Sequence, residues 1–245
     1  MPVPRSRSSL HVTDTPGCDK DVPVTDDPSR TIETTTIGEA WLEIARLIME
    51  SGYASTYDGL GAREVLLTTI VVRSPRTTDD IVERYADPER LAWMRANFND
   101  FDEVRELGDA DSYATRLHNY AGSGLDQLRW VGDRLRRDPL SRSAVVTTFQ
   151  PLSDTSYIPC VSLLDFYLAD DSLHLVVYAH SIDFGAKGYA NLLELAAIQH
   201  QVAAELDQPV GSLTMIVKSS HVYDGDAAFV ASVLKSSALN RHGTV

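Results

Sequence analysis

Cysteine is scarce in this sequence of 245 residues, which contains only Cys18 and Cys160. Cys18 lies in a polar stretch and Cys160 lies far from it in the body of the chain. This arrangement differs from the dense cysteine framework of small secreted domains. We therefore expect no structural disulfide, and a reducing cytoplasm is the simplest location.

Long hydrophobic runs and positive charge are also missing. No apolar stretch is long enough to span a bilayer, and the N-terminal residues lack the apolar segment of a signal peptide. Lys and Arg number 22 against 35 Asp and Glu, and the resulting net charge of −13 argues against a surface that neutralises nucleic-acid phosphates. We therefore expect neither a membrane nor a nucleic acid among the partners.

The residues that are present suit one domain with a sizeable core. Hydrophobic residues make up 43% of the sequence, which is enough for a single core in a chain of this length. Residues 1–30 are rich in Pro, Ser, Thr and Asp and show almost no hydrophobic periodicity, so we expect a disordered tail. Residues 31–245 should form the single domain.

The hydrophobic pattern of that domain predicts an α+β fold. Helical spacing occurs at residues 37–51, 77–98 (as one or two helices), 125–137, 189–206 and 226–236. Strand patterns occur at residues 64–73, 144–149, 161–168, 173–179 and 213–218. Thr36 can cap the first helix, and Pro88 can open a second helix within 77–98. We expect a mostly antiparallel sheet with helices over one face.

The other face of this sheet must also be shielded from water. Strands this hydrophobic rarely face water in a monomer, so we expect a homodimer packed sheet against sheet. The alternative is a monomer with a solvated sheet.

Cys160 has two interpretations from its own context. Pro159 cannot donate a ladder hydrogen bond and marks the start of a strand, so Cys160 lies at the strand's mouth, a position suited to chemistry. Free cysteine is also one of the most commonly buried residues, and the thiol alone could be core packing.

Several short motifs in a fixed order bear on this choice. They are Thr36–Gly52, Tyr57–Ser74, Asp138-Pro139-Leu140-Ser141-Arg142, Ile158-Pro159-Cys160, His180-Ser181-Ile182-Asp183, Asn191 and His221-Val222-Tyr223. In this order and spacing they resemble the thymidylate synthase family, which includes pyrimidine nucleotide hydroxymethylases. The resemblance covers most of the chain and implies the same fold and a homodimer.

The resemblance also implies catalytic roles. Cys160 would be the nucleophile that adds to carbon 6 of a pyrimidine ring, and Arg142 would reach into the neighbouring subunit's site and lower the thiol pKa. Tyr113 would help to remove the proton from carbon 5. Asp183 would hold the pterin ring of 5,10-methylenetetrahydrofolate. From the residues alone, Asp183 could also be a helix cap and Tyr113 a surface side chain.

Substrate contacts are implied in the same way. Asn191 would read the base, and an amide suits uracil whereas a carboxylate would suit cytosine. His221 and Tyr223 alternate on one strand and would both face a sugar hydroxyl. His180, Ser181 and Ser143 would lie at the phosphate. From its residue type, Asn191 could equally be a capping or helix-face amide.

The sequence departs from the family at the phosphate and folate positions. Of four expected arginines only Arg142 is kept, because Tyr57 or Asp58, Ser143 and His180 stand at the other three. The family's folate-contacting stretch before the asparagine is replaced by Gly-Ala-Lys-Gly-Tyr-Ala at residues 185–190. Glu83, Glu89 and Trp93 lie in the region of the family's catalytic glutamate without its motif, and the closing C-terminal tail is not recognisable.

We therefore expect folate-dependent hydroxymethylation or methylation at carbon 5 of a pyrimidine nucleoside or an unusual nucleotide, through a covalent Cys160 adduct. A site less shielded from water would favour the hydroxymethyl product. The alternatives are ordinary thymidylate synthesis with a divergent phosphate site, or a non-catalytic relic that binds a ligand.

Overall fold

The structure of the protein, a computed structural model, describes residues 30–155 and 157–242. The expected disordered tail lies outside the described residues except for Arg30, and Cys18 lies outside them too.

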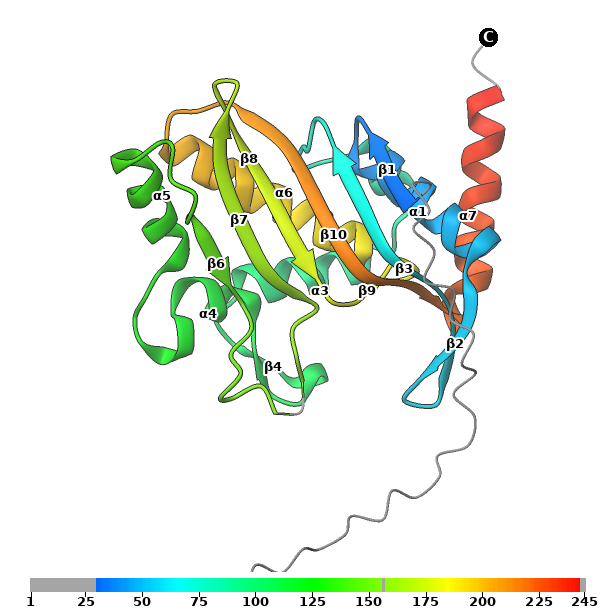
Figure 1. Ribbon diagram of the computed structural model, residues 1–245. Coiled ribbons are helices and arrows are strands. Elements are labelled where there is room, and N and C mark those ends of the chain that lie inside the picture. Colours follow the sequence, from blue (N-terminus) through cyan, green and yellow to red (C-terminus); the bar gives the residue numbers. More distant parts are fainter. Residues whose placement is uncertain (1–29, 156, 243–245) are drawn as a thin grey trace, which may run out of the picture.

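One mixed sheet of eight strands organises the fold (Figure 1). The strand order is β1 (Thr31–Thr34), β3 (Leu60–Val72), β10 (Val210–Tyr223), β8 (Ser172–Ala179), β7 (Val161–Ala169) and β6 (Val145–Thr147), with β2 (Tyr53–Tyr57) beside β3 and β9 (Ile182–Asp183) beside β10. β1 runs parallel to β3, and β10 runs parallel to both β8 and β9. The other pairs are antiparallel. The α+β class is confirmed, and the sheet contains more parallel pairing than the sequence pattern predicts.

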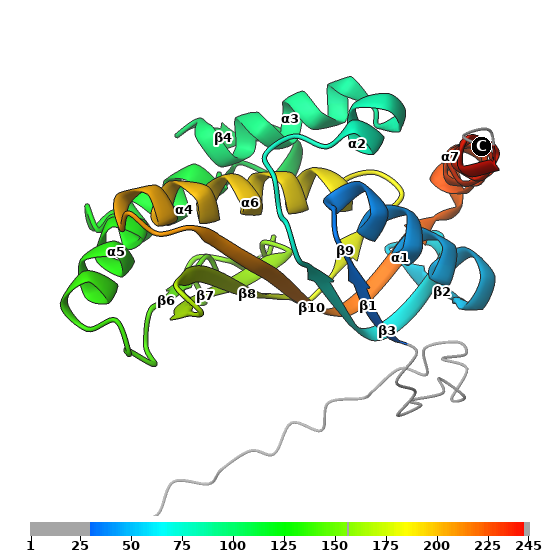
Figure 2. The same ribbon diagram turned by 90° about the horizontal axis from the view of Figure 1, so that it is seen from above.

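Helices lie on one side of this sheet, as Figure 2 shows. They are α1 (Ile37–Ser51), α2 (Asp80–Tyr85), α3 (Pro88–Asn99), α4 (Tyr113–His118), α5 (Gln127–Arg137) and α6 (Gly188–Glu205), and α7 (Asp224–His242) stands at the end of the sheet. A small ribbon of β4 (Glu103–Val104) and β5 (Ala110–Asp111) and the short turns η2 (Arg105–Leu107) and η3 (Tyr120–Gly122) connect α3, α4 and α5. Within the described residues, no helix is long and apolar enough to cross a membrane.

The first helix begins where its capping residues predict. The Thr36 hydroxyl accepts a hydrogen bond from the Glu39 backbone N–H at 3.2 Å, and the Glu39 carboxylate accepts one from the Thr36 N–H at 3.1 Å. On the buried face of α1, Trp41 Nε1 donates to the Phe184 carbonyl at 3.0 Å, and its ring lies 4.4 Å from the ring of Tyr189. These contacts fix the start of α6 against α1.

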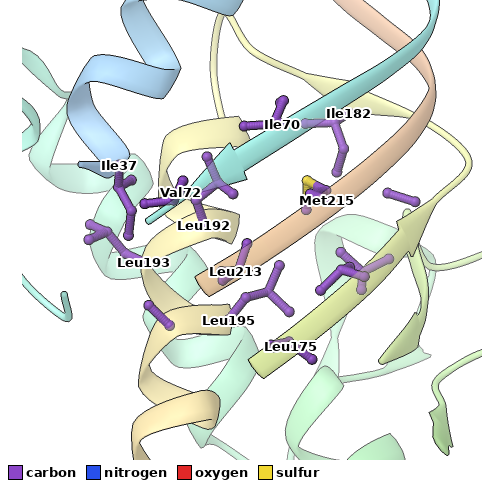
Figure 3. Packing of buried hydrophobic residues seen from close by; sticks show 14 of the residues in the cluster. Ile37, Ile70, Val72, Leu175, Ile182, Leu192, Leu193, Leu195, Leu213 and Met215 are labelled. Atoms are coloured by element: carbon purple, nitrogen blue, oxygen red, sulfur yellow. The ribbon is translucent and has the colours of Figure 1, made fainter. Parts of the chain in front are cut away.

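The core lies between the sheet and α6 (Figure 3). Alternate residues of the central strands point to this side, as Leu213 and Met215 do on β10. Leu192 and Leu195 of α6 pack against them. α6 is buried around most of its circumference because α1, α3 and α5 cover the sides that the sheet does not.

The opposite face of the sheet is partly apolar and uncovered in the single chain. Tyr167 of β7, Tyr178 of β8 and Ile216 of β10 are 40%, 39% and 38% exposed on three adjacent strands. Neighbouring large apolar side chains of this kind favour burial by a second molecule. The sheet-to-sheet homodimer stays a prediction that this surface supports.

A buried ion pair fixes the segment that precedes Cys160. The Arg116 guanidinium of α4 makes two hydrogen bonds to the Asp154 carboxylate, at 2.8 and 2.9 Å, and the two side chains are 2% and 5% exposed. Arg116 also donates to the carbonyls of Asp111 and Thr148. The Gln150 N–H donates to Asp154 at 2.7 Å. The sequence pattern gave no sign of this pair.

We predict that Arg116→Leu lowers the free energy of unfolding by roughly 3–5 kcal/mol, because it leaves the Asp154 carboxylate buried and unpaired. Adding Asp154→Asn should recover part of that loss. Urea unfolding followed by fluorescence measures both. Arg136→Leu is the control, since its partner Asp133 is 53% exposed and the loss should stay below about 1 kcal/mol. Equal effects of the two single substitutions would contradict this account.

Candidate active site

Cys160 lies immediately before β7, as Pro159 predicts. Its carbonyl accepts a hydrogen bond from the His180 N–H at 3.0 Å, which connects the start of β7 to the end of β8. The next residue, Val161, donates its N–H to the Tyr113 hydroxyl at 3.0 Å. The thiol is therefore held between two elements and borders the core rather than lying within it.

Burial is the main influence on this thiol, and it raises the pKa of Cys160. The Lys187 ammonium and a hydrogen bond from Tyr157 act in the opposite direction, and the Asp183 carboxylate adds to the rise. Arg142 is exposed in the loop after α5 and is not among the chief influences within one chain. Its expected role across a dimer stays a prediction.

Tyr113 is the first residue of α4 and is buried, so the alternative of a surface tyrosine is wrong. Its ring stacks on Phe98 with centroids 4.3 Å apart. Burial, followed by Tyr157 and Cys160, raises the pKa of the Tyr113 phenol well above its ordinary value. A phenol held near the Cys160 thiol in its neutral form fits the expected location of this residue.

Asp183, His221 and Tyr223 form a second cluster. β9 pairs with β10 so that Asp183 lies opposite His221, and the His221 ring meets the edge of the Tyr223 ring at 4.8 Å. Asp183 Oδ1 accepts from the N–H groups of Gly185 and Ala186, so it closes the turn before α6, whose N-cap residue is Lys187. The alternative that Asp183 is the N-cap of this helix is therefore wrong.

Asp183 and His221 of this cluster are both displaced towards their neutral forms. Burial raises the pKa of Asp183, opposed by His221. Burial also lowers the pKa of His221, opposed by Asp183 and then by Glu64. The Tyr53 hydroxyl donates to Glu64 at 2.7 Å, and the Ser219 hydroxyl donates to the same carboxylate. The sequence pattern did not indicate that Glu64 faces His221.

Asn191 lies in the first turns of α6 and is 4% exposed. Its Nδ2 donates to the Lys187 carbonyl at 3.1 Å, whereas its Oδ1 is buried without a hydrogen-bond partner among the described residues. The contact with Lys187 sets the orientation of the amide, because a flipped amide would place two acceptors together. A buried acceptor without a partner is uncommon and suits a ligand N–H group.

The positions expected at a phosphate carry little positive charge. Tyr57 is 68% exposed and Ser143 is exposed, while Ser181 is partly buried. His180 Nδ1 lies 3.3 Å from the Ser162 hydroxyl, and burial followed by the nearby Lys218 ammonium lowers the pKa of His180. The imidazole is thus neutral near pH 7. Lys218 is a nearby cation that belongs to none of the sequence motifs.

A groove with a volume of about 500 Å³ lies at the N-terminal end of α6. Its lining includes acidic, basic and aromatic groups: Asp87, Glu89, Arg90, Trp93, Glu106, Leu107 and Lys187. The Lys187 Nζ sits 4.1 Å above the centroid of the Trp93 ring. Arg90 donates to the Gly185 carbonyl and pairs with Asp226 at 2.7 Å. Glu83 is exposed on α2 and does not line the groove.

The structure therefore brings together most of the predicted side chains. Cys160 affects the pKa values of Tyr113 and Tyr223, and Asp183 affects the pKa of Cys160. Asn191 lies in the first turn of α6, the helix that follows Asp183. Arg142 and Ser143 remain apart in the loop after α5. The sequence motifs assigned no role to Tyr157, which directly precedes Ile158-Pro159-Cys160, or to Lys187, which lies in the divergent stretch at residues 185–190. Within the described ranges, no three His, Cys, Asp or Glu side chains are grouped to hold a metal ion.

Comparison with known proteins gives a consistent result. The family model described as "Thymidylate synthase" matches residues 72–241. A protein of Methanosarcina barkeri named "Putative thymidylate synthase" is 30% identical over 84% of this chain and 95% of its own length. The "Deoxyuridylate hydroxymethyltransferase" of Bacillus phage SP01 is 39% identical over 44% of this chain and 30% of its own length. The chain therefore belongs to the thymidylate synthase family.

Proposed function

We propose that the protein transfers a one-carbon unit from 5,10-methylenetetrahydrofolate to carbon 5 of a pyrimidine nucleoside or unusual nucleotide, through a covalent adduct between Cys160 and carbon 6. The single observation that carries the proposal is the buried Oδ1 of Asn191 on α6, which has no hydrogen-bond partner in the described part of the chain. A folded relic without a ligand would leave that acceptor unsatisfied at a cost of about 1–3 kcal/mol.

The residues that line the groove, together with Asp183, suit the binding of a folate. The groove has the volume of a typical small-molecule site, roughly 300–1,000 Å³, and combines an aromatic face at Trp93 with cations at Arg90 and Lys187. Asp183 would hold the pterin N–H groups, Trp93 would pack on a ring, and the cations would meet carboxylates. When bound, the folate supplies the methylene that carbon 5 receives.

The protein's own groups perform the remaining tasks. The Cys160 thiolate adds to carbon 6, the S–C bond forms, and the electron pair of the 5,6 double bond moves towards carbon 5 and the carbon 4 oxygen. Asn191 Oδ1 accepts from the ring N–H and so fixes a uracil-type ring. His221 and Tyr223 orient the sugar. Tyr113 lies beside Cys160, where it can assist loss of the carbon 5 proton.

The choice between a methyl and a hydroxymethyl product concerns how well the site excludes water. The similarity to a phage deoxyuridylate hydroxymethyltransferase over 116 residues favours the hydroxymethyl product. Hydroxymethylation requires that water attack the activated methylene, whereas methylation requires hydride delivery in a drier site. We propose hydroxymethylation as the main outcome.

We predict that the purified protein releases tritium from carbon 5 of labelled uridine or deoxyuridine, or of their monophosphates, when methylenetetrahydrofolate is present. Cys160→Ser should reduce the release at least about a hundredfold, because a serine hydroxyl is a far poorer nucleophile at neutral pH. Cys18→Ser is the matched control and should retain full activity. Full activity of Cys160→Ser would exclude the covalent route, and no release from any substrate would favour a non-catalytic relic.

We also propose a homodimer in which Arg142 serves the site of the partner subunit. Separate Cys160→Ser and Arg142→Gln proteins should each be nearly inactive. After mixing and subunit exchange, about a quarter of the sites should be intact, because one site of each heterodimer has both residues. Tritium release measured before and after exchange tests this. No recovery, with exchange confirmed by mass spectrometry, would place Arg142 in its own subunit's site or outside the site.

The phosphate positions favour a substrate without a dianion. His180 is neutral near pH 7, Ser143 and Tyr57 are uncharged, and the net charge of −13 gives no long-range attraction to an anion. Charge-assisted contacts to guanidinium groups are the usual source of phosphate affinity, and three of them are missing here. We propose that the substrate is a nucleoside or carries a non-phosphate group at this end.

We predict that a uracil nucleoside binds at least as tightly as its 5′-monophosphate. Ser143→Arg combined with His180→Arg should shift the preference towards the monophosphate, more strongly at low salt than at high salt. Calorimetric titration of both ligands to both proteins measures the change, and Lys235→Arg on α7 serves as a charge-neutral control. A hundredfold preference of the unmodified protein for the monophosphate would mean that other cations, with Lys218 the first to test, supply the clamp.

A further inference from the structure

A row of polar side chains crosses the end of the sheet where β9 adjoins β10 (Figure 1). Tyr53 of β2 pairs with Glu64 of β3, and Glu64 pairs in turn with His221 of β10. On its other side, His221 pairs with Asp183 of β9. Directly opposed residues of antiparallel strands point to the same face, with Cβ atoms about 4.5–5.5 Å apart. The His221 imidazole therefore lies between two carboxyl groups that come from different strands.

The two carboxyl groups differ in how they are held. Glu64 Oε2 accepts a hydrogen bond from the Tyr53 hydroxyl at 2.7 Å, and its Oε1 accepts one from the Ser219 hydroxyl. Burial acts to raise the pKa of Glu64, but the hydrogen bonds from Ser219 and then Tyr53 outweigh it and lower that pKa. Burial raises the pKa of Asp183. The negative charge beside the imidazole is therefore greater on the β3 side.

The imidazole itself is confined. His221 is 8% exposed, and its ring meets the Tyr223 ring edge to face, with centroids 4.8 Å apart and an interplanar angle of 75°. Burial lowers the pKa of His221, so the ring is neutral near pH 7 and has one N–H nitrogen and one acceptor nitrogen. A carboxylate on one side of a neutral imidazole favours the tautomer whose N–H is directed towards it.

We propose that Glu64 is a positioning residue for His221: its carboxylate selects the tautomer with the N–H towards β3 and leaves the other ring nitrogen to accept a hydrogen bond from a sugar hydroxyl. Tyr53 and Ser219 keep the carboxylate in place through their two hydroxyl donors. The sugar hydroxyl as ligand rests on the proposed function, whereas the tautomer of His221 can be measured without any substrate.

The other charged or titratable groups near this row do not take the same role. Asp183 Oδ1 already accepts from two backbone N–H groups, and Asp226 of α7 adds to the rise of its pKa. Burial followed by Asp183 raises the pKa of Tyr223, which keeps that phenol neutral. Arg30 donates to the Leu66 carbonyl of β3 at 2.7 Å, beyond the row. The β3 carboxylate is therefore the ionised group paired directly with the imidazole.

The experiment records the nitrogen chemical shifts of His221 in full-length protein with nitrogen-15-labelled histidine, over a range of pH and without substrate. The chain has seven histidines, and comparison with His221→Gln identifies the signals. One tautomer should predominate in the unmodified protein. Glu64→Gln keeps the size and an acceptor oxygen but removes the charge, so it should lower the His221 pKa by about one further unit and raise the share of the minor tautomer.

Matched variants separate charge from structure. Glu33→Gln removes an exposed carboxylate of the same sheet, paired with Arg73 at 2.8 Å, and should leave the imidazole unchanged. Tyr53→Phe combined with Ser219→Ala keeps the charge of Glu64 but removes both hydroxyl donors, so it should shift the tautomer ratio in the same direction as Glu64→Gln. This double variant carries the test if Glu64→Gln does not fold. An unchanged tautomer ratio in the folded variants, or an equal change in Glu33→Gln, would overturn the proposal.

Calorimetric titration tests the contact with the sugar. Deoxyuridine carries a 3′-hydroxyl that 2′,3′-dideoxyuridine lacks. Glu64→Gln should weaken the binding of deoxyuridine about fivefold, which corresponds to the loss of one ordinary hydrogen bond, and should leave the binding of dideoxyuridine unchanged. Equal weakening for both nucleosides would mean that the substitution disturbs the site as a whole, and the proposed role in sugar recognition would be wrong.

If the tautomer ratio shifts as expected while neither nucleoside binds and no tritium is released from any pyrimidine, the effect of Glu64 on His221 stands and the proposed function is wrong. If tritium is released and the His221 signals are the same in Glu64→Gln, the proposed function stands and the role of Glu64 is wrong. The two proposals therefore fail separately.

Discussion

The register of β10 is the constraint on which the site depends. Its first half lies between β3 and β8 and is held there by alternating core residues such as Leu213 and Met215. Its last residues continue past β8 and pair with β9, which sets His221 opposite Asp183. A shift of one residue would turn the core side chains outward and take His221 off that face. Packing in the core therefore fixes the geometry of polar groups several residues away.

Burial has a second consequence, because it displaces the ionisable groups of the site towards their neutral forms. The pKa of Cys160 and the pKa of Asp183 are raised, and those of His180 and His221 are lowered, with burial as the first cause in each case. This displacement supports the proposed substrate, which offers hydrogen-bond donors and acceptors more than charge. The family's arginine clamp would be costly to bury here unless a phosphate compensated each guanidinium.

Local signals in the sequence predicted the elements that depend on local interactions. The capping residue Thr36 and the helix-opening Pro88 mark the starts of α1 and α3, as expected. The strand predicted at 213–218 extends over Val210–Tyr223, because its polar end is held by pairing with β3 and β9 rather than by its own pattern. The Arg116–Asp154 pair and the contacts of Lys187 could not be predicted, since each joins residues far apart in sequence.

The segment between Asp183 and Asn191 explains why the departures from the family occur together. Asp183 closes the turn, and the Lys187 carbonyl orients the Asn191 amide. The Lys187 ammonium lies over the Trp93 ring in the groove and also lowers the pKa of Cys160. One short turn thereby connects the Asn191 amide, the groove lined by Trp93 and the electrostatic surroundings of Cys160. A substitution in this turn acts on all three features at once, so the stretch Gly-Ala-Lys-Gly-Tyr-Ala at residues 185–190 agrees with the proposal of a substrate that differs from the family's usual one.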